Sequence, residues 1–312
     1  MTGRAAVIVN PRARRAGGDW HVAVRAVLAA RWPRVELLYP PHAAAVTEIA
    51  RGAREQGYEI IIAAGGDGTV NAVANGLAGT GLPLGILPLG TANDLAREVG
   101  IPRDLRAAAR LLVHGIARPT DLVSVNGHSF CTVGGIALVS RSALAVTRLK
   151  EGSPGIRRVA NTLGGGIYRL AATACLLAPR AIVGTVRIAY RDPDGGAERT
   201  AIFKAHALFV ANHRTLGGGL VLPTGGNAHD GIFELCVVPE RSRPSLMVNF
   251  ARLSSGAPLP PGVLLTLRAT SAEIVCGEAE SFVADGELLA TGREFSLRCL
   301  PGAVMLIGGA RD

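Results

Sequence analysis

Lysine is nearly absent from this sequence of 312 residues. Only Lys150 and Lys204 occur among 33 basic residues, so arginine supplies almost all of the positive charge. Acidic residues number 24, which leaves a formal net charge of +9 at pH 7. Such a chain attracts anions, including nucleic acid, acidic lipid headgroups and nucleotide phosphates. Aromatic residues make up only 4%, which disfavours surfaces that bind nucleic acid by base stacking. We therefore expect no nucleic-acid partner.

Paired cysteines and long hydrophobic runs are also missing. The five cysteines lie far apart and include no CxxC pair, which argues against a zinc knuckle and against a disulfide framework. A reducing compartment fits this pattern best. The apolar run near the N-terminus has five residues, too few for a signal-peptide core. The longest apolar-looking stretch, 163–178, contains three glycines and Arg169, so it is too short and too polar to span a bilayer. These features predict a cytoplasmic protein that meets a membrane only at its surface.

The first third of the chain alternates between short apolar runs and amphipathic helical stretches. With 48% hydrophobic and 18% charged residues, the chain is folded, and its length predicts about two domains. Strand–helix alternation is typical of a parallel α/β sheet. We predict strands at 5–9, 35–38, 59–64 and 84–87, and helices at 19–31, 43–56, 69–78, 91–99 and 105–114. These elements predict a nucleotide-binding α/β domain over 1–125, to which about 300–312 return.

After about residue 121, many segments alternate polar and apolar residues with a period of two. Turn signals separate them, such as Asp194-Gly195, Asp230-Gly231 and Asp285-Gly286. The pattern predicts a mostly antiparallel β-sandwich domain over 126–299, with one helical insert at about 140–177. Its strands are expected at 121–125, 183–190, 205–211, 232–238, 263–269, 273–275, 281–283 and 294–297.

The strongest local signal is a glycine-rich loop, Gly65-Gly66-Asp67-Gly68-Thr69, between a buried strand and a helix. Glycines let the backbone approach a ligand, and the helix start offers N–H groups and the positive end of a dipole. A carboxylate among such amides makes sense if Mg²⁺ lies between it and a phosphate. Glycine-rich turns between strands and helices are common, however, so an ordinary turn is about equally expected from this loop alone.

Two more loops repeat the arrangement. Pro88-Leu89-Gly90-Thr91-Ala92-Asn93-Asp94 follows the fourth strand and leads into a helix, and 10–15 follows the first strand. Asp94 could simply compensate a helix dipole, and the arginines at 12, 14 and 15 could form a solvated basic loop. In a parallel sheet all three loops emerge at the carboxyl edge, where ligands bind. No GxxxxGK[ST] occurs, and Asn71 stands where the third glycine of GxGxxG belongs, so a P-loop enzyme and a dinucleotide-dependent dehydrogenase are both disfavoured.

The ordered motifs resemble the diacylglycerol kinase catalytic-domain family, which includes sphingosine, ceramide and bacterial lipid kinases. GGDGT at 65–69 and PLGTANDLAR at 88–97 carry the resemblance, and Asn10-Pro11 matches the family's opening loop. Weaker matches follow in the right order: Asn212, Gly217–Gly219, Pro223, 228–231 and Asp285-Gly286-Glu287. The likeness covers nearly the whole chain, from about residue 5 to 307.

The resemblance implies that the chain transfers the γ-phosphoryl group of ATP to a lipid hydroxyl, with diacylglycerol as the simplest acceptor. ATP and Mg²⁺ would be the cofactors. Asp67, Asp94 and Asp121 would organise the catalytic Mg²⁺. A structural Mg²⁺ would be held by Asn227, Asp230 and Ile232. Alternatively, Asp230-Gly231 would serve only as a turn. Asp121 could equally cap the start of a strand. The residues expected to bind ATP are Asn10, Pro11, Arg12, Ala13, Arg14, Gly65, Gly66, Asp67, Gly68, Thr69, Val70, Asn71, Gly90, Thr91 and Asn93.

Glu287, with Asp285 beside it, is the catalytic pair that the resemblance implies. Glu287 would be the general base that takes the proton of the attacking hydroxyl, and Asp285 would serve the turn. From the residues alone, a hairpin turn is the simpler explanation of Asp285-Gly286-Glu287. The sequence departs from the family where Ala72 replaces a frequent glutamate and where Arg12-Ala13-Arg14 replaces the usual end of NPxSG. The second change would shift phosphate binding in the first loop towards guanidinium groups, and the first would remove any polar contact made by the glutamate.

The expected partners are a lipid at a membrane surface, an anionic membrane and a second copy in a homodimer. Five arginines at 148, 157, 158, 169 and 180 are set among apolar residues, which fits either an interfacial surface or an ordinary basic helix. Peripheral membrane association of a cytoplasmic enzyme follows from the first interpretation. Two other functions stay open: an NAD kinase-like phosphotransferase, since that superfamily shares the GGDGT loop, and a degenerate protein that binds nucleotide or membrane without catalysis.

Overall fold

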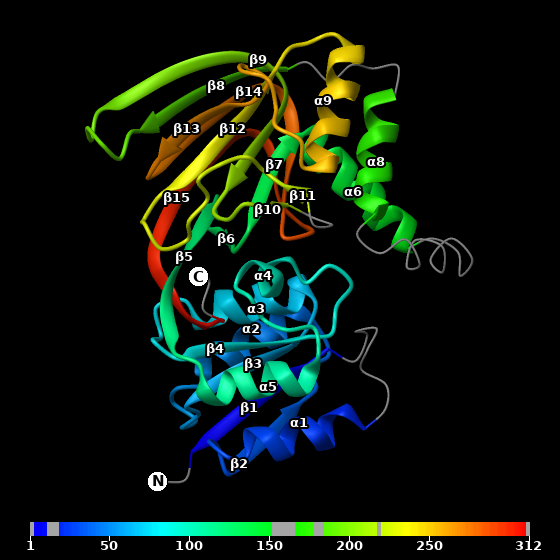
Figure 1. Ribbon diagram of the computed structural model, residues 1–312. Coiled ribbons are helices and arrows are strands. Elements are labelled where there is room, and N and C mark those ends of the chain that lie inside the picture. The colour runs from blue at the N-terminus through cyan, green and yellow to red at the C-terminus, as the bar shows by residue number, and fades with distance from the viewer. Residues whose placement is uncertain (1–2, 11–18, 152–165, 178–183, 217–219, 310–312) are drawn as a thin grey trace. The chain divides into compact units, whose positions relative to one another are not determined.

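The computed structural model describes residues 3–10, 19–151, 166–177, 184–216 and 220–309 (Figure 1). The chain forms two compact units: unit 1 comprises residues 1–120 and 301–312, and unit 2 comprises residues 121–300. The predicted ATP-binding residues Pro11, Arg12, Ala13 and Arg14 lie outside the described residues.

Unit 1 is built on a five-stranded parallel sheet. Its order is β15 (Glu287–Ile307, whose last residues belong to this unit), β4 (Pro83–Pro88), β3 (Ile60–Gly65), β1 (Arg4–Val9) and β2 (Arg34–Leu38). Met305 pairs with Pro83 and Leu306 with Leu84, so the end of β15 forms part of this sheet. Strands β1, β3 and β4 are buried on both faces, and Ile60, Ile61 and Ile62 are fully buried. Each such side chain contributes about 1.5–3 kcal/mol of hydrophobic stabilisation.

Helices cover both faces of this sheet (Figure 1). Helix α1 (Trp20–Leu28) packs against α5 (Leu105–His114), and α2 (Ala43–Gly52) packs against α3 (Asp67–Leu77). From β1 the chain moves to β2 on one side and then to β3 on the other, so right-handed crossovers place α1 and α2 on opposite faces. Local capping fixes two of the helix starts: Asp104 accepts a hydrogen bond from the Ala107 amide (2.8 Å), and a ring nitrogen of His42 accepts one from the Ala45 amide (3.2 Å).

Unit 2 is mostly antiparallel, as expected for the β-sandwich. Its strands are β5 (Ala117–Val125), β6 (His128–Phe130), β7 (Val133–Ala137), β8 (Gly184–Arg191), β9 (Glu198–Ala211), β10 (Thr215–Leu216), β11 (Leu220–Val221), β12 (Phe233–Pro239), β13 (Leu265–Ala269), β14 (Ser271–Ala284) and most of β15. The long strands β9 and β14 each pair with β8 along one half and with β7 along the other. The sheet therefore bends back on itself around a core that contains Phe130, Phe282 and Phe295.

Three helices complete the described part of unit 2: α6 (Leu138–Glu151), α8 (Gly166–Leu177) and α9 (Arg243–Ser255). The first two fall within the predicted insert, but α9 was not predicted. Its signals were nevertheless present, because Ser242 precedes it, Pro244 lies in its first turn, and Gly256 ends it with φ of 74°. The predicted strands at 273–275 and 281–283 are parts of the single strand β14, which has one register shift between them and another between Phe282 and Val283.

Candidate active site

The loops that follow β1 and β3 lie at the point where the crossovers of unit 1 diverge. Strands β1 and β3 are neighbours, yet the helices that follow them leave to opposite faces of the sheet. Ligands of open α/β sheets bind at the carboxyl ends of strands at such a switch point. Asn10 follows β1, and its side-chain amide donates to the Thr69 hydroxyl at 3.1 Å, beyond the end of β3. The sequence-predicted Asn10 and Thr69 are therefore brought together.

The two glycine loops, 65–69 after β3 and 88–94 after β4, approach each other backbone to backbone. The carbonyl of Gly65 accepts hydrogen bonds from the amides of Leu89 (3.0 Å) and Gly90 (3.2 Å). A Cβ added to Gly90 would lie 2.4 Å from Cα of Gly66, a separation that real Cβ atoms do not show. Glycine is therefore required at 90 by the close approach of the two loops.

Asp67 links the same two loops through its side chain. Its carboxylate accepts hydrogen bonds from the amide of Asn93 (3.0 Å) and from the amide of Asp94 (2.7 Å). Asn93 adopts a left-handed backbone with φ of 51°, and its side chain exchanges hydrogen bonds with Gly90. This conformation starts α4 (Asp94–Glu98) at Asp94, three residues later than the predicted helix. Asp94 is buried and pairs with Arg97 at 3.3 Å.

This arrangement can hold an anion beside a carboxylate. The first amides of α3 have no preceding helical turn to bond to, and the positive end of the helix dipole lies at the same place. Asp67 belongs to that first turn, with Gly66 as the N-cap. A nucleotide phosphate fits the amides, and a divalent cation fits between the phosphate and the carboxylate. The structure thus assembles Asn10, 65–69 and 90–94 into one set of loops.

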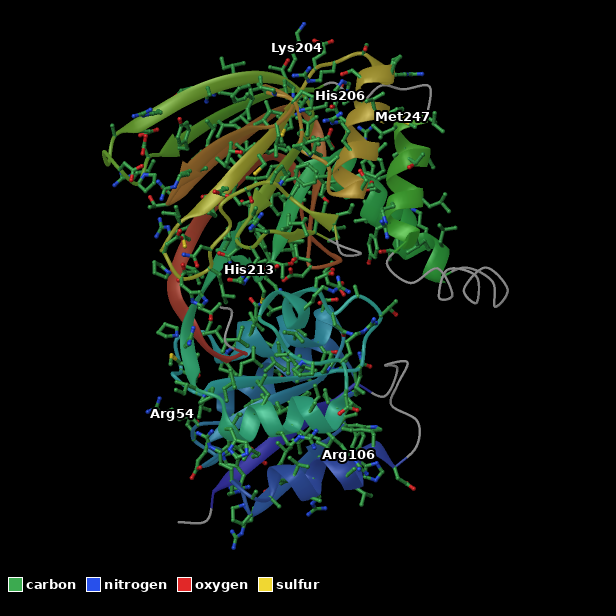
Figure 2. The ribbon with its side chains drawn as sticks, in the orientation of Figure 1. Arg54, Arg106, Lys204, His206, His213 and Met247 are labelled. Atoms are coloured by element: carbon green, nitrogen blue, oxygen red, sulfur yellow. The ribbon has the colours of Figure 1, made fainter. Side chains whose placement is uncertain are left out.

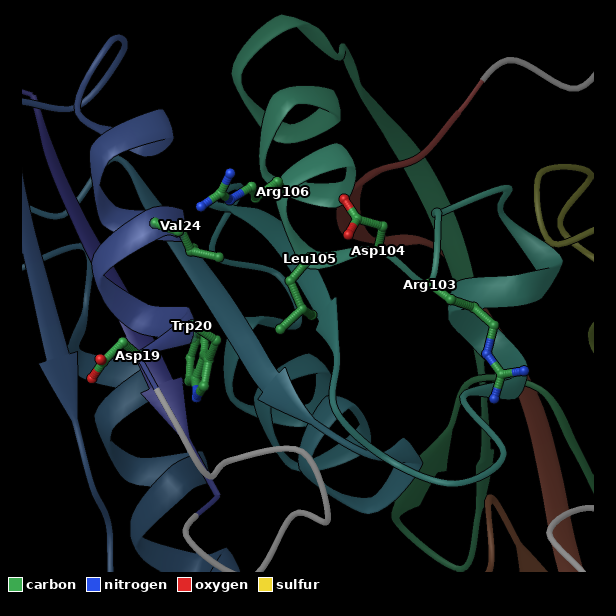
Figure 3. Close-up of a pocket in the computed structure, with 8 residues that line it drawn as sticks. Asp19, Trp20, Val24, Arg103, Asp104, Leu105 and Arg106 are labelled. Atoms are coloured by element: carbon green, nitrogen blue, oxygen red, sulfur yellow. The ribbon is translucent and has the colours of Figure 1, made fainter.

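A cavity of about 600 Å³ lies on the α1–α5 face of unit 1 (Figure 3). Trp20 and Leu105 provide apolar lining, as do Ala23 and Val24, and charged side chains surround them. The charges are Arg103 and Arg106 against Asp19 and Asp104, so the lining has no net charge to select an anion. The cavity does not include the described residues of the glycine loops.

In unit 2, the carboxylate of Asp285 holds a distant piece of backbone. Asp285 and Gly286 form the two-residue turn between β14 and β15, both with positive φ (49° and 83°). The Asp285 carboxylate accepts hydrogen bonds from the amides of Cys131 (2.7 Å) and Thr132 (3.0 Å) and from the Thr132 hydroxyl (2.5 Å). The side chain therefore positions the turn. Glu287, the expected base, is exposed and begins β15 opposite Ala284.

Thr132 connects several parts of unit 2, a role that sequence reasoning missed. Its carbonyl accepts hydrogen bonds from the amides of Asn212 (2.9 Å) and His213 (3.2 Å). The Asn212 side chain donates in turn to the carbonyls of Asp121 and Cys131, both at 2.8 Å. The match of Asn212 to the family pattern was the available signal. These bonds fix the backbone that Asp285 contacts.

Asp121 and Asp230 lie in one neighbourhood of unit 2. Asp121 is buried, and its carboxylate accepts a hydrogen bond from the Gly231 amide at 2.7 Å. Asp230 accepts one from the Ile232 amide at 3.2 Å, as in an Asx turn. Although Asp230 is exposed as a residue, loss of solvation at its carboxylate, followed by the Asp121 charge, raises its pKa.

The described residues contain no group of three or more His, Cys, Asp or Glu side chains arranged to hold a metal ion. Both predicted Mg²⁺ sites therefore stay predictions. Histidine also serves packing in unit 2: His206 is buried in β9, and its Nε2 lies 3.1 Å from the donating amide of Arg241 (Figure 2). None of the described helices is both long enough and apolar enough to cross a bilayer.

Comparison with known proteins identifies the two halves of the chain. The family "Diacylglycerol kinase catalytic domain" matches residues 4–125, and "YegS C-terminal NAD kinase beta sandwich-like domain" matches residues 172–308. The protein named "Probable lipid kinase YegS-like" from Klebsiella pneumoniae (strain 342) is 32% identical over 256 residues, which cover 79% of this chain and 76% of that protein. The chain belongs to the YegS-like lipid kinase family. It is accordingly a kinase, and the resemblance seen in the sequence is confirmed.

Two further proteins are similar to this YegS-like chain, one in sequence and one in structure. The diacylglycerol kinase of Bacillus subtilis (strain 168) is 48% identical over 92 residues, which cover 28% of this chain and 30% of that protein. A crystal structure of a diacylglycerol kinase from Bacillus anthracis str. Sterne superposes with a TM-score of 0.71 at 22% identity, covering 98% of this chain and 97% of that chain. The structural likeness confirms the predicted fold class.

Proposed function

We propose that this YegS-like protein transfers the γ-phosphoryl group of ATP to the hydroxyl of diacylglycerol and so forms phosphatidate. The observation that carries the proposal is the linked pair of glycine loops at the switch point of unit 1, where Gly66 and Gly90 touch and Asp67 bonds to Asn93 and Asp94. The B. subtilis relative, named a diacylglycerol kinase, supports the choice of acceptor.

In this proposal the nucleotide phosphates lie on the amides of 65–71 and beside Asn10, Thr91 and Asn93. Loops fixed by backbone contacts suit this task, because phosphoryl transfer depends mainly on positioning and on neutralising charge. The chemistry of Asp67 suits a cation as well, because an ionised carboxylate lies in the first turn of α3, beside the amides proposed to hold the phosphates. Mg²⁺ is commonly held by one or two carboxylates plus phosphate oxygens, so a complete protein cage is not required.

Glu287 is the proposed base. It is exposed at the start of β15, on a turn that Asp285 holds through three hydrogen bonds. A carboxylate suffices, because the hydroxyl proton leaves late in a loose transition state. The glutamate takes this proton as the hydroxyl oxygen forms its bond to the γ-phosphorus and the bond to the β–γ bridging oxygen breaks.

The test is phosphorylation of a panel of acceptors by the purified full chain, with γ-labelled ATP and Mg²⁺. The panel contains diacylglycerol, phosphatidylglycerol, sphingosine, ceramide and NAD in mixed micelles or buffer. We expect labelled phosphatidate, its loss on adding EDTA, and a decrease of about 10²–10⁴-fold in kcat for Glu287→Gln. Glu278→Gln, another exposed glutamate of unit 2, is the matched control.

Two results would overturn the proposed reaction, and a third would overturn only the role of Glu287. Labelling of NAD without labelling of lipid would identify an NAD kinase-like enzyme. ATP binding without transfer to any acceptor would identify a protein that has lost catalysis. Full activity in Glu287→Gln would remove this residue from the mechanism while leaving the kinase assignment in place.

A further inference from the structure

In Figure 1, helix α8 is the labelled helix farthest to the right in unit 2. It packs against α6 and α9, whereas α6 packs on strands β7, β9 and β14. One side of α8 is buried in this contact, through Ile167, Ala171, Ala172 and Leu176. These buried side chains hold α8 against the neighbouring helices.

The opposite side of α8 is also apolar. Leu170 and Leu177 are 59% and 63% exposed, and Ala174 between them is exposed as well. Residues spaced i, i+4 and i+7 lie on one face of a helix, so these three form a continuous stripe, which we call the α8 outer face. A helix on the surface of a globular protein normally presents polar residues there. Arg169 is the only charged residue of α8.

The helical layer around this face is strongly basic. Its five arginines are all exposed, and among the residues whose side chains the structure describes in these helices there is no aspartate or glutamate. Further exposed apolar side chains belong to the same layer, namely Leu149 on α6 and Val248 on α9. The arginines are Arg148, Arg169, Arg243, Arg252 and Arg141, the last of which forms an ion pair with Glu280 of β14 at 3.6 Å.

We propose that the α8 outer face docks on the surface of an anionic lipid bilayer, with Arg148 of α6 and Arg169 of α8 contacting the headgroups. Apolar side chains entering the headgroup region together with basic residues near acidic lipids are the two contributions that hold an interfacial helix on a membrane. A second copy of the chain fits less well. A symmetric dimer through this face would bring the same arginine-rich surface against itself, with like charges opposed.

This inference rests on the proposed function in one respect: a kinase whose acceptor is a membrane lipid must meet the bilayer to obtain it. Vesicle binding, however, does not require catalysis. The docking proposal and the kinase proposal can therefore fail separately.

The test is co-sedimentation of the full chain with vesicles of phosphatidylcholine alone or of phosphatidylcholine and phosphatidylglycerol in equal parts, without ATP. We expect binding to the anionic vesicles only, and weaker binding as salt is raised. Leu170→Ser with Leu177→Ser should reduce the partition coefficient at least about tenfold, because two exposed leucines no longer enter the lipid. Ile202→Ser is the matched control, since Ile202 is 66% exposed on β9.

A second pair of substitutions tests the electrostatic contribution of the arginines to vesicle binding. Each arginine near an anionic surface contributes roughly fivefold in binding, so Arg148→Gln with Arg169→Gln should lower the partition coefficient by about 25-fold. Arg187→Gln, on an exposed position of β8, should leave binding nearly unchanged. Circular dichroism checks that every variant is folded.

A gain-of-signal variant covers the case in which the serine variant does not fold. Leu177→Trp should show a blue-shifted fluorescence on anionic vesicles, and Ile202→Trp should not, both measured against the background of Trp20 and Trp32. The proposal is wrong if Ile202→Ser weakens binding as much as the leucine pair does, or if the fluorescence of Leu177→Trp does not shift. It is also wrong if the leucine pair changes only the oligomeric state, because the face would then be an interface between copies.

Activity on a short-chain diacylglycerol that is monomeric in solution separates the two proposals. The leucine and arginine variants should phosphorylate this acceptor at the wild-type rate while losing activity on vesicles. No transfer by the wild type to any acceptor would defeat the proposed function but would leave the vesicle result standing.

Discussion

Replacing Asp285 with alanine should destabilise unit 2 severely. The change removes the acceptor of the Cys131 and Thr132 amides, and both residues are buried (4% and 6% exposed). An orphaned buried donor costs about 1–3 kcal/mol, and alanine in the left-handed region costs about 1 kcal/mol more. The expected loss is therefore about 3 kcal/mol or more, a large share of the roughly 5–15 kcal/mol that stabilises a typical domain.

The assay is urea denaturation of the full chain, followed by far-ultraviolet circular dichroism, together with hydrogen exchange at the amides of Cys131 and Thr132. Asp285→Asn retains one side-chain acceptor and tolerates positive φ, so it should lose about half as much. The control is Asp194→Ala, in the exposed hairpin between β8 and β9, where the carboxylate forms an ion pair with an exposed Arg268. A surface pair of this kind is worth about 0–1 kcal/mol.

The reasoning is refuted if Asp285→Ala costs no more than Asp194→Ala, or if the two amides exchange as slowly as in the wild type. A second consequence concerns activity. Because Asp285 holds the turn that carries Glu287, Asp285→Asn should lower kcat for phosphoryl transfer more than it raises KM for ATP.

Two further outcomes follow from altered pKa values. Loss of solvation and the Asp121 charge raise the pKa of Asp230 in the folded protein. The protonated carboxyl group therefore contributes to the free energy of unfolding. This contribution is fully present below the pKa of the unfolded state and is lost as pH rises through the pKa of the folded state. Asp230→Asn should therefore gain stability relative to wild type between pH 3 and pH 7 in urea titrations, and a constant or reversed difference would contradict this. Burial raises the pKa of the Cys236 thiol to about 12, whereas Cys175 is only partly buried, so iodoacetamide at pH 8 should modify Cys175 first in the native protein. Mass spectrometry of the labelled chain checks the order, and early labelling of Cys236 would be the contrary result.

Much of unit 1 could be predicted from the sequence, because its signals are local. The apolar run before Gly65 and the glycines after it predicted a buried strand and a turn, and the structure has β3 at Ile60–Gly65 and α3 from Asp67. Asp285-Gly286 predicted a two-residue hairpin in unit 2, and both residues have positive φ as such a turn requires.

The contacts that hold the candidate site together were beyond the reach of local patterns. Asp67 was expected to serve Mg²⁺, but its hydrogen bonds to Asn93 and Asp94 join residues 26 and 27 positions apart. The bonds from Cys131 and Thr132 to Asp285 join residues 154 and 153 positions apart. Periodicity and turn chemistry describe one segment at a time. A single sequence therefore does not predict which distant residues become hydrogen-bond partners in the folded chain.

The most direct measurement of the central claim is calorimetric titration of the full chain with ATP in the presence of Mg²⁺, comparing the wild type with Gly90→Ala. The added Cβ would lie 2.4 Å from Cα of Gly66 and must force the two loops apart, whereas Gly184→Ala meets no atom within 4 Å and serves as the control. If the linked loops hold the nucleotide phosphates, the wild type and Gly184→Ala bind ATP saturably and Gly90→Ala binds at least about tenfold more weakly, a difference of about 1.4 kcal/mol. Equal affinity in all three proteins, or no binding of ATP by the wild type, would contradict the account.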